Sequence, residues 1–82
     1  MTTKAVRDYR SSYLATLDTR NHGQRFLNLL ALRTAIMVAA ELQGFRPAVH
    51  VLLEDVEWAM EQARHQGALA AGVKLGEWSA AA

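Results

Sequence analysis

Apolar residues recur at helical spacing in three stretches of the chain, and residues that end a helix follow each stretch. In the first stretch they lie three or four positions apart, which places them on one stripe at about 100° per residue: Val6, Tyr9, Tyr13 and Leu17. Thr2 or Thr3 is able to cap such a helix. The pattern predicts a helix over residues 3–17 with one narrow buried face.

The second stretch, residues 24–43, contains no glycine or proline and is dense in strong helix formers, so it is predicted to be helical throughout. Asn21 followed by Gln24 matches a capping box at its start. Its large apolar residues occupy every side of the helix: Phe26, Leu27, Leu29, Leu30, Leu32, Ile36, Met37, Val38 and Leu42. A helix apolar on nearly all sides must be surrounded, and two other helices of so short a chain cannot easily cover it.

We therefore expect a second copy of the chain or another protein to cover part of this helix, and of the two we predict the second copy, which makes the expected fold an all-α, dimeric helical bundle. Ala31, Ala35 and Ala39 form a ridge of small side chains at steps of four, which allows another helix to approach closely. The expected dimer interface consists of Leu27, Leu30, Ala31, Ala35, Val38, Ala39 and Leu42.

Gly44 and Pro47 separate the second stretch from the third, because glycine suits the end of a helix and proline its first turn. The third stretch is predicted to be an amphipathic helix over residues 47–66 that ends at Gly67. Its buried stripe is expected to contain Val49, Leu52, Leu53, Val56, Ala59, Met60 and Ala63. A short fourth helix is expected over residues 68–75.

Two tryptophans and a valine lie off the buried stripes. Val51 and Trp58 are seven positions apart and share another side of the third helix, and Trp78 lies in the tail. Tryptophan is enriched among the residues that dominate binding energy at protein interfaces. The surface expected to contact a partner protein comprises Val51, Glu54, Trp58, Glu61 and Trp78.

Length and composition favour one small soluble domain that associates with itself. With 82 residues, a chain that folds alone removes only about 60% of its unfolded surface from water. Cysteine is absent, which excludes disulfides and thiolate zinc sites as reinforcement and leaves oligomerisation as a common alternative.

The charged N-terminal segment has no apolar core, so no signal peptide is expected. Arg33 interrupts the longest apolar region, so no membrane span is expected and the predicted location is the cytoplasm.

Charge is distributed unevenly along the chain. Residues 1–33 contain six basic and two acidic residues, a net charge of +4, whereas residues 34–82 contain three basic and six acidic residues, a net charge of −3. The two halves should attract each other, within one chain or between two.

The corner between the second and third stretches has some features of a DNA-reading helix-turn-helix. Ala40 and Gly44 fit that motif, but Gln43 and His50 stand where apolar residues are expected. The helix that would enter the groove contains Glu54, Asp55, Glu57 and Glu61, which phosphate would repel. We interpret the corner as a hairpin connection and do not expect nucleic acid as a partner.

No residue pattern indicates catalysis, a cofactor or a metal ion. The histidines and acidic residues on one side of the third helix, His50 to His65, span about 22 Å at helical rise, so one ion cannot gather them. No nucleophile elbow or glycine-rich phosphate loop is present. We predict no catalytic, cofactor-binding or metal-binding residues.

The segment LDTRNHGQRFLNLLALR is similar at a few positions to the first helix of chorismate mutases, small helical dimers that bind a dicarboxylate with arginines and lysines. The shared positions are Leu17, Asp18, Leu29, Leu30 and Arg33. The chain departs from that pattern in the longer spacing from Asp18 to Arg33, in the NHG interruption, and in lacking a lysine at Gln43 or Gly44, so we do not assign it to the family. The similarity implies one alternative, a small helical enzyme with an anion pocket formed by Arg10, Arg25 and Arg33.

The function predicted from these patterns is a small non-enzymatic protein-binding module that acts as a helical dimer. Such a module could be a regulator, inhibitor, adaptor or chaperone of another protein, and its Ala-rich, Arg-over-Lys composition is compatible with a bacterial or phage origin. Three alternatives remain open: a nucleic-acid-binding transcriptional regulator, the small helical enzyme, and a subunit of a larger assembly.

Overall fold

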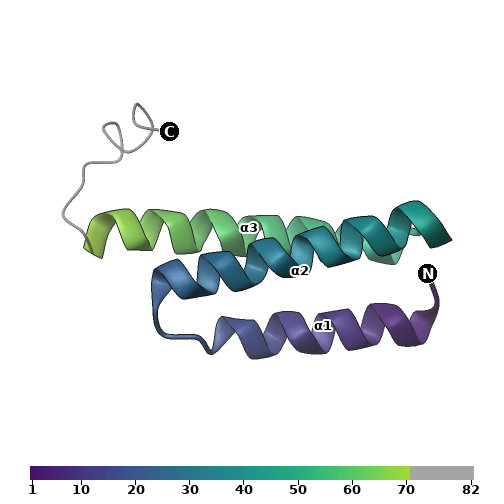
Figure 1. Ribbon diagram of the computed structural model, residues 1–82, viewed down its shortest axis with the longest axis horizontal. Coiled ribbons are helices and arrows are strands. Elements are labelled where there is room, and N and C mark those ends of the chain that lie inside the picture. The colour runs from purple at the N-terminus through teal and green to yellow at the C-terminus, as the bar shows by residue number, and fades with distance from the viewer. Residues whose placement is uncertain (71–82) are drawn as a thin grey trace.

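A computed structural model describes residues 1–70 as three helices and no strand. Helix α1 covers Thr3–Leu17, α2 covers His22–Gln43 and α3 covers Pro47–Ala70. The helices run side by side along the long axis of the molecule (Figure 1). The prediction of an all-helical fold is therefore confirmed for the described residues, with the three long helices close to their predicted positions.

Side-chain caps fix the starts of the first two helices. The Thr2 hydroxyl accepts a hydrogen bond from the Ala5 amide at 3.1 Å, and the Asn21 side chain accepts one from the Gln24 amide at 2.8 Å. Each satisfies an amide that has no partner within the helix. Because Asn21 is the cap itself, α2 begins at His22, two residues before the predicted start.

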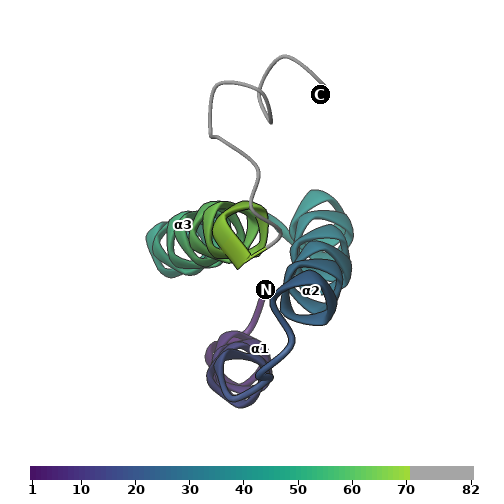
Figure 2. The same ribbon diagram turned by 90° about the vertical axis from the view of Figure 1, so that its left-hand side faces the viewer.

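Residues 44–46 connect α2 to α3, and the two helices turn back along each other as a hairpin (Figures 1 and 2). Gly44 has a φ of 100°, a conformation that residues with a side chain rarely adopt. Pro47 is the first residue of α3, as predicted. The corner is thus a hairpin connection rather than the wide crossing of a helix-turn-helix.

The prediction that α3 ends at Gly67 is wrong, because the helix continues to Ala70. Ala68 is 1% exposed, so the additional turn buries apolar surface that offsets the low helix propensity of glycine. The predicted break between a third and a fourth helix does not exist at this position. The remainder of the predicted fourth helix, residues 71–75, and Trp78 lie outside the described residues.

The core lies along the line where the three helices meet. In α2 it takes one face only, Leu29, Ile36 and Ala40. In α3 it takes most of the predicted stripe, since Val49, Leu52, Leu53, Val56, Ala59 and Ala63 are buried and Met60 packs at the edge. The spacing of apolar residues in the third stretch therefore identified the core face of α3 correctly.

Helix α1 covers the core from below the α2–α3 hairpin (Figure 2). Tyr13 is its buried residue, and Val6 and Tyr9 pack beside it, as the predicted stripe requires. Leu17 was predicted to lie on the same stripe but is 40% exposed. It is the last residue of α1, where the chain turns away toward α2 and the side chain is only partly covered.

Candidate functional site

The side of α2 that faces away from the core is apolar and exposed. We call it the outer stripe and define it as Leu27, Leu30, Ala31, Thr34, Ala35, Val38 and Leu42, all of which are exposed. Its four large side chains have exposed fractions of 57% for Leu27, 38% for Leu30, 52% for Val38 and 81% for Leu42. At 100° per residue these positions lie opposite the buried Leu29, Ile36 and Ala40.

The structure brings six of the seven residues predicted for a dimer interface onto this one face. The seventh, Ala39, is half-buried and packs against the core of its own chain. Thr34, which was not in the predicted set, also lies on this face. A contiguous exposed apolar surface of this kind marks an interaction site more often than isolated exposed residues do.

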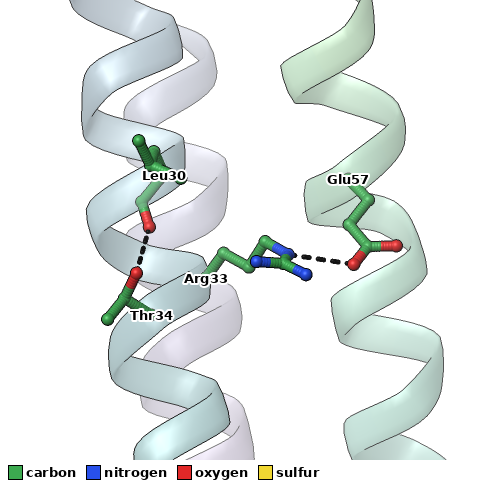
Figure 3. Close-up of polar contacts among 4 residues, drawn as sticks. All are labelled: Leu30, Arg33, Thr34 and Glu57. Carbon is green, nitrogen blue, oxygen red and sulfur yellow. Dashed lines mark hydrogen bonds and ion pairs between the residues drawn. The ribbon is translucent and has the colours of Figure 1, made fainter.

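The seven residues of the outer stripe are uncharged; the exposed Glu41 borders them, and the neighbouring Arg33 is held away from them. Arg33 extends across to α3, where its Nε donates to Glu57 Oε1 at 2.9 Å (Figure 3). The Thr34 hydroxyl donates to the Leu30 carbonyl at 3.0 Å, on the side of α2 away from α3. The hydroxyl therefore needs no external partner, and the stripe is equivalent to an apolar surface.

By length and composition α2 is apolar enough to cross a membrane, and 17% of its most apolar 18-residue window is buried within the chain. Arg33 lies near the middle of the helix and pairs with Glu57 on α3. A charged pair at that depth is costly in hydrocarbon. The Arg33–Glu57 pair therefore does not suit the middle of a membrane span.

A second exposed surface lies on α3, away from the outer stripe. Trp58 is 66% exposed and Val51 is 51% exposed. Glu54 and Glu61 are exposed beside them, and Glu61 accepts a hydrogen bond from Arg64 at 3.3 Å. Of the predicted partner-binding residues, these four lie on one helix, and Trp78 lies outside the described residues.

Trp58 lines an open groove of about 290 Å³ between α1 and α3. The groove also contains Leu17, Ala59, Gln62, Gln66 and Arg25. The part played by Leu17 was missed in the sequence, because its spacing matches the buried stripe of α1. Only the end of α1, where packing stops, exposes it. We call this surface the Trp58 groove.

Another groove, of about 320 Å³, separates α2 from α3 and is lined by Phe26, Arg33, Glu57, Met60, Glu61 and Arg64. Its charged side chains neutralise one another in two ion pairs, Arg33 with Glu57 and Arg64 with Glu61. Ion pairs this exposed contribute little to stability. They also leave no uncompensated charge for a ligand in this groove.

The three arginines considered for an anion pocket have three different partners. Arg10 pairs with Asp55 at 3.1 Å and Arg33 pairs with Glu57. Arg25 donates to the Thr19 carbonyl at 2.9 Å and to Gln66 Oε1 at 2.6 Å, and contacts His22 Nδ1 at 2.8 Å. The structure therefore does not bring them together, and Arg25 ties the α1–α2 connection to the end of α3.

Within residues 1–70, no three histidine or acidic side chains cluster closely enough to hold a metal ion. The Tyr13 hydroxyl has a raised pKa: burial raises it, nearby Asp55 raises it further, and Arg10 lowers it. Phe45, in the α2–α3 connection, stacks on His50 in the first turn of α3, with ring centroids 5.4 Å apart.

Comparison with known proteins gave no assignment. The chain matches no protein-family model, no curated protein and no solved structure. The outer stripe and the Trp58 groove are therefore the two features on which a function can be based.

Proposed function

We propose that the protein is a small non-enzymatic protein-binding module that acts as a homodimer and serves as a regulator, inhibitor, adaptor or chaperone of another protein. One observation carries the proposal: α2 buries one face in its own core and exposes a second apolar face, the outer stripe, directly opposite. An exposed apolar face of this length is removed from water when another surface covers it.

The Trp58 groove supports the second half of the proposal, the binding of another protein. Trp58 is two-thirds exposed and lies beside Leu17 in the groove between α1 and α3. Tryptophan combines a large apolar ring with a hydrogen-bond donor, and it is enriched at the centres of binding interfaces. Because the groove and the outer stripe share no residue, and Arg25 is the groove's only lining residue from α2, self-association through the stripe would leave the groove open to a partner.

Self-association is tested by sedimentation across a range of protein concentrations, with two valine variants as a matched pair. Val38 in the outer stripe and Val51 on α3 are 52% and 51% exposed. Val38→Glu places a charge on the stripe and is expected to keep the chain monomeric, whereas Val51→Glu should leave dimerisation unchanged. A wild-type chain that remains monomeric up to millimolar concentration, with the helical circular-dichroism spectrum intact, would contradict the proposed dimer.

Partner binding is tested by comparing wild-type protein with Trp58→Ala as bait in an extract of the native host. The expected result is a protein that the wild type retains at stoichiometric yield, that Trp58→Ala loses, and that binds again when both purified proteins are mixed. Val6→Ala serves as the control, because Val6 is half-buried in α1 and packs against the core. Equal retention by all three baits would show that the Trp58 groove is not the binding surface.

A further inference from the structure

The outer stripe has a pattern that fits a second copy of itself in one particular orientation. We infer that two α2 helices pack antiparallel through this face, with a two-fold axis passing between Thr34 and Ala35. The inference rests on the proposed self-association and specifies its geometry. In this arrangement, residues whose numbers add to 69 face each other across the interface.

The sizes of the side chains agree with this register. Leu27 of one copy faces Leu42 of the second copy at each end of the interface. Ala31 faces Val38, so a small side chain meets a larger one. At the centre Thr34 faces Ala35, and these short side chains allow the helices to approach closely where they cross. A two-fold interface repeats each of these contacts, because the same surface of each copy takes part.

The charge beside the stripe favours the antiparallel direction. Glu41 is exposed near the C-terminal end of α2. In an antiparallel pair with this register it lies level with Asn28 of the other helix, an uncharged residue. In a parallel pair both Glu41 side chains would lie at the same level, next to two negative helix ends. The antiparallel arrangement separates the two carboxylates by about 20 Å along the axis.

Neither Thr34 nor Arg33 opposes this contact. The Thr34 hydroxyl already donates to the Leu30 carbonyl, so the interface buries no unsatisfied donor (Figure 3). Arg33 is held against Glu57 on α3, away from the stripe. In Figure 2, α1 and α3 lie on one side of α2, and the outer stripe lies opposite the buried residues of α2.

The area involved is sufficient for a specific but modest dimer. The exposed fractions of the stripe residues correspond to roughly 500 Å² of apolar surface in one copy, so a pair would bury about 1,000 Å², the lower limit of specific interfaces. Dimerisation is therefore expected to depend on concentration. A lipid surface suits the stripe less well, because membrane-surface helices carry basic residues along their polar edges, whereas Glu41 borders this stripe.

The absence of cysteine from the chain allows the direction of packing to be read from single-cysteine variants. After mild oxidation, Leu27→Cys alone and Leu42→Cys alone should remain uncrosslinked, because the two equivalent positions lie about 22 Å apart in an antiparallel pair. An equimolar mixture of the two should form a disulfide-linked dimer. Ser11→Cys, exposed on α1, is the control for random collision and should give no dimer alone or in mixture.

Each outcome decides the inference. A crosslink in the mixture and none in the separate variants supports the antiparallel pair. Self-crosslinking of Leu27→Cys and of Leu42→Cys would overturn the antiparallel direction but leave the proposed dimer intact. A wild-type chain that is monomeric by sedimentation, or that sediments as a dimer while no variant crosslinks, would overturn the interface. Flotation of the wild type with phosphatidylcholine vesicles in place of dimerisation would assign the stripe to a lipid surface and overturn it as well.

Discussion

Tyr13 is buried at the edge of the core, with the Arg10–Asp55 ion pair near its hydroxyl. Tyr13 is 9% exposed. Asp55 raises the pKa of its hydroxyl and Arg10 lowers it, and these two residues pair with each other at 3.1 Å. The spacing of apolar residues in α1 predicted that Tyr13 is buried. It did not predict the ion pair beside it, because Arg10 and Asp55 are 45 positions apart and only the packing of α1 on α3 joins them.

The raised pKa of Tyr13 predicts how stability depends on alkaline pH. The unfolded chain ionises this tyrosine near its ordinary value of about 10, while burial keeps it neutral in the folded chain to higher pH. Stability from this group is therefore complete below pH 10 and is lost as pH rises through the folded pKa. Urea denaturation from pH 8 to pH 11 should show a smaller loss for Tyr13→Phe than for the wild type. Equal losses would contradict the assignment.

At the scale of the element, whether a helix ends at a glycine depends on the residues that follow it. Gly44 ends α2, whereas Gly67 lies inside α3. Both positions hold the same residue, and both were predicted to be helix ends. The neighbours on the C-terminal side make the difference. Gly44 precedes Phe45, Arg46 and Pro47, and proline starts a new helix, while Gly67 precedes Ala68, which is buried.

This difference predicts opposite effects for the same substitution at the two glycines. At Gly67 an added Cβ would lie 3.6 Å from the Cβ of His22, an ordinary contact, so Gly67→Ala should stabilise the chain by about 0.5–1 kcal/mol. At Gly44, with φ of 100° and ψ of 151°, Gly44→Ala should cost about 1–3 kcal/mol. Denaturation of the two variants beside the wild type measures both. Destabilisation by Gly67→Ala would show that α3 does not continue through this position.

At the scale of the whole molecule, the two faces of α2 differ in burial: one is packed in the core and the other is exposed. The sequence indicated correctly that this helix is apolar on every side and that its own chain would not cover it completely. It could not indicate which side would remain uncovered, because Leu29 and Leu30 are chemically identical neighbours. The position of α1 and α3 on one side of α2 decides that Leu29 is fully buried and Leu30 is 38% exposed.

The two faces predict different costs for truncation along one helix. Ile36 is fully buried, so Ile36→Ala should lower the free energy of unfolding by about 2–5 kcal/mol at any protein concentration. Leu42 is 81% exposed, so Leu42→Ala should change it by about 0.5 kcal/mol or less in dilute protein. Urea denaturation at low micromolar concentration compares the two directly. A large cost for Leu42→Ala in a monomeric sample would contradict the exposed position of this side chain.

The Trp58 groove, which shares no residue with the outer stripe, has a consequence for avidity. If two copies join through α2 as we propose, the pair would present this groove twice. A target with two matching segments would then bind its second segment at a raised effective concentration, and its residence time would lengthen without any new contact. This bivalent binding would be lost when the protein is diluted below the dissociation constant of the dimer. The concentration of the protein would therefore determine how long it retains such a target.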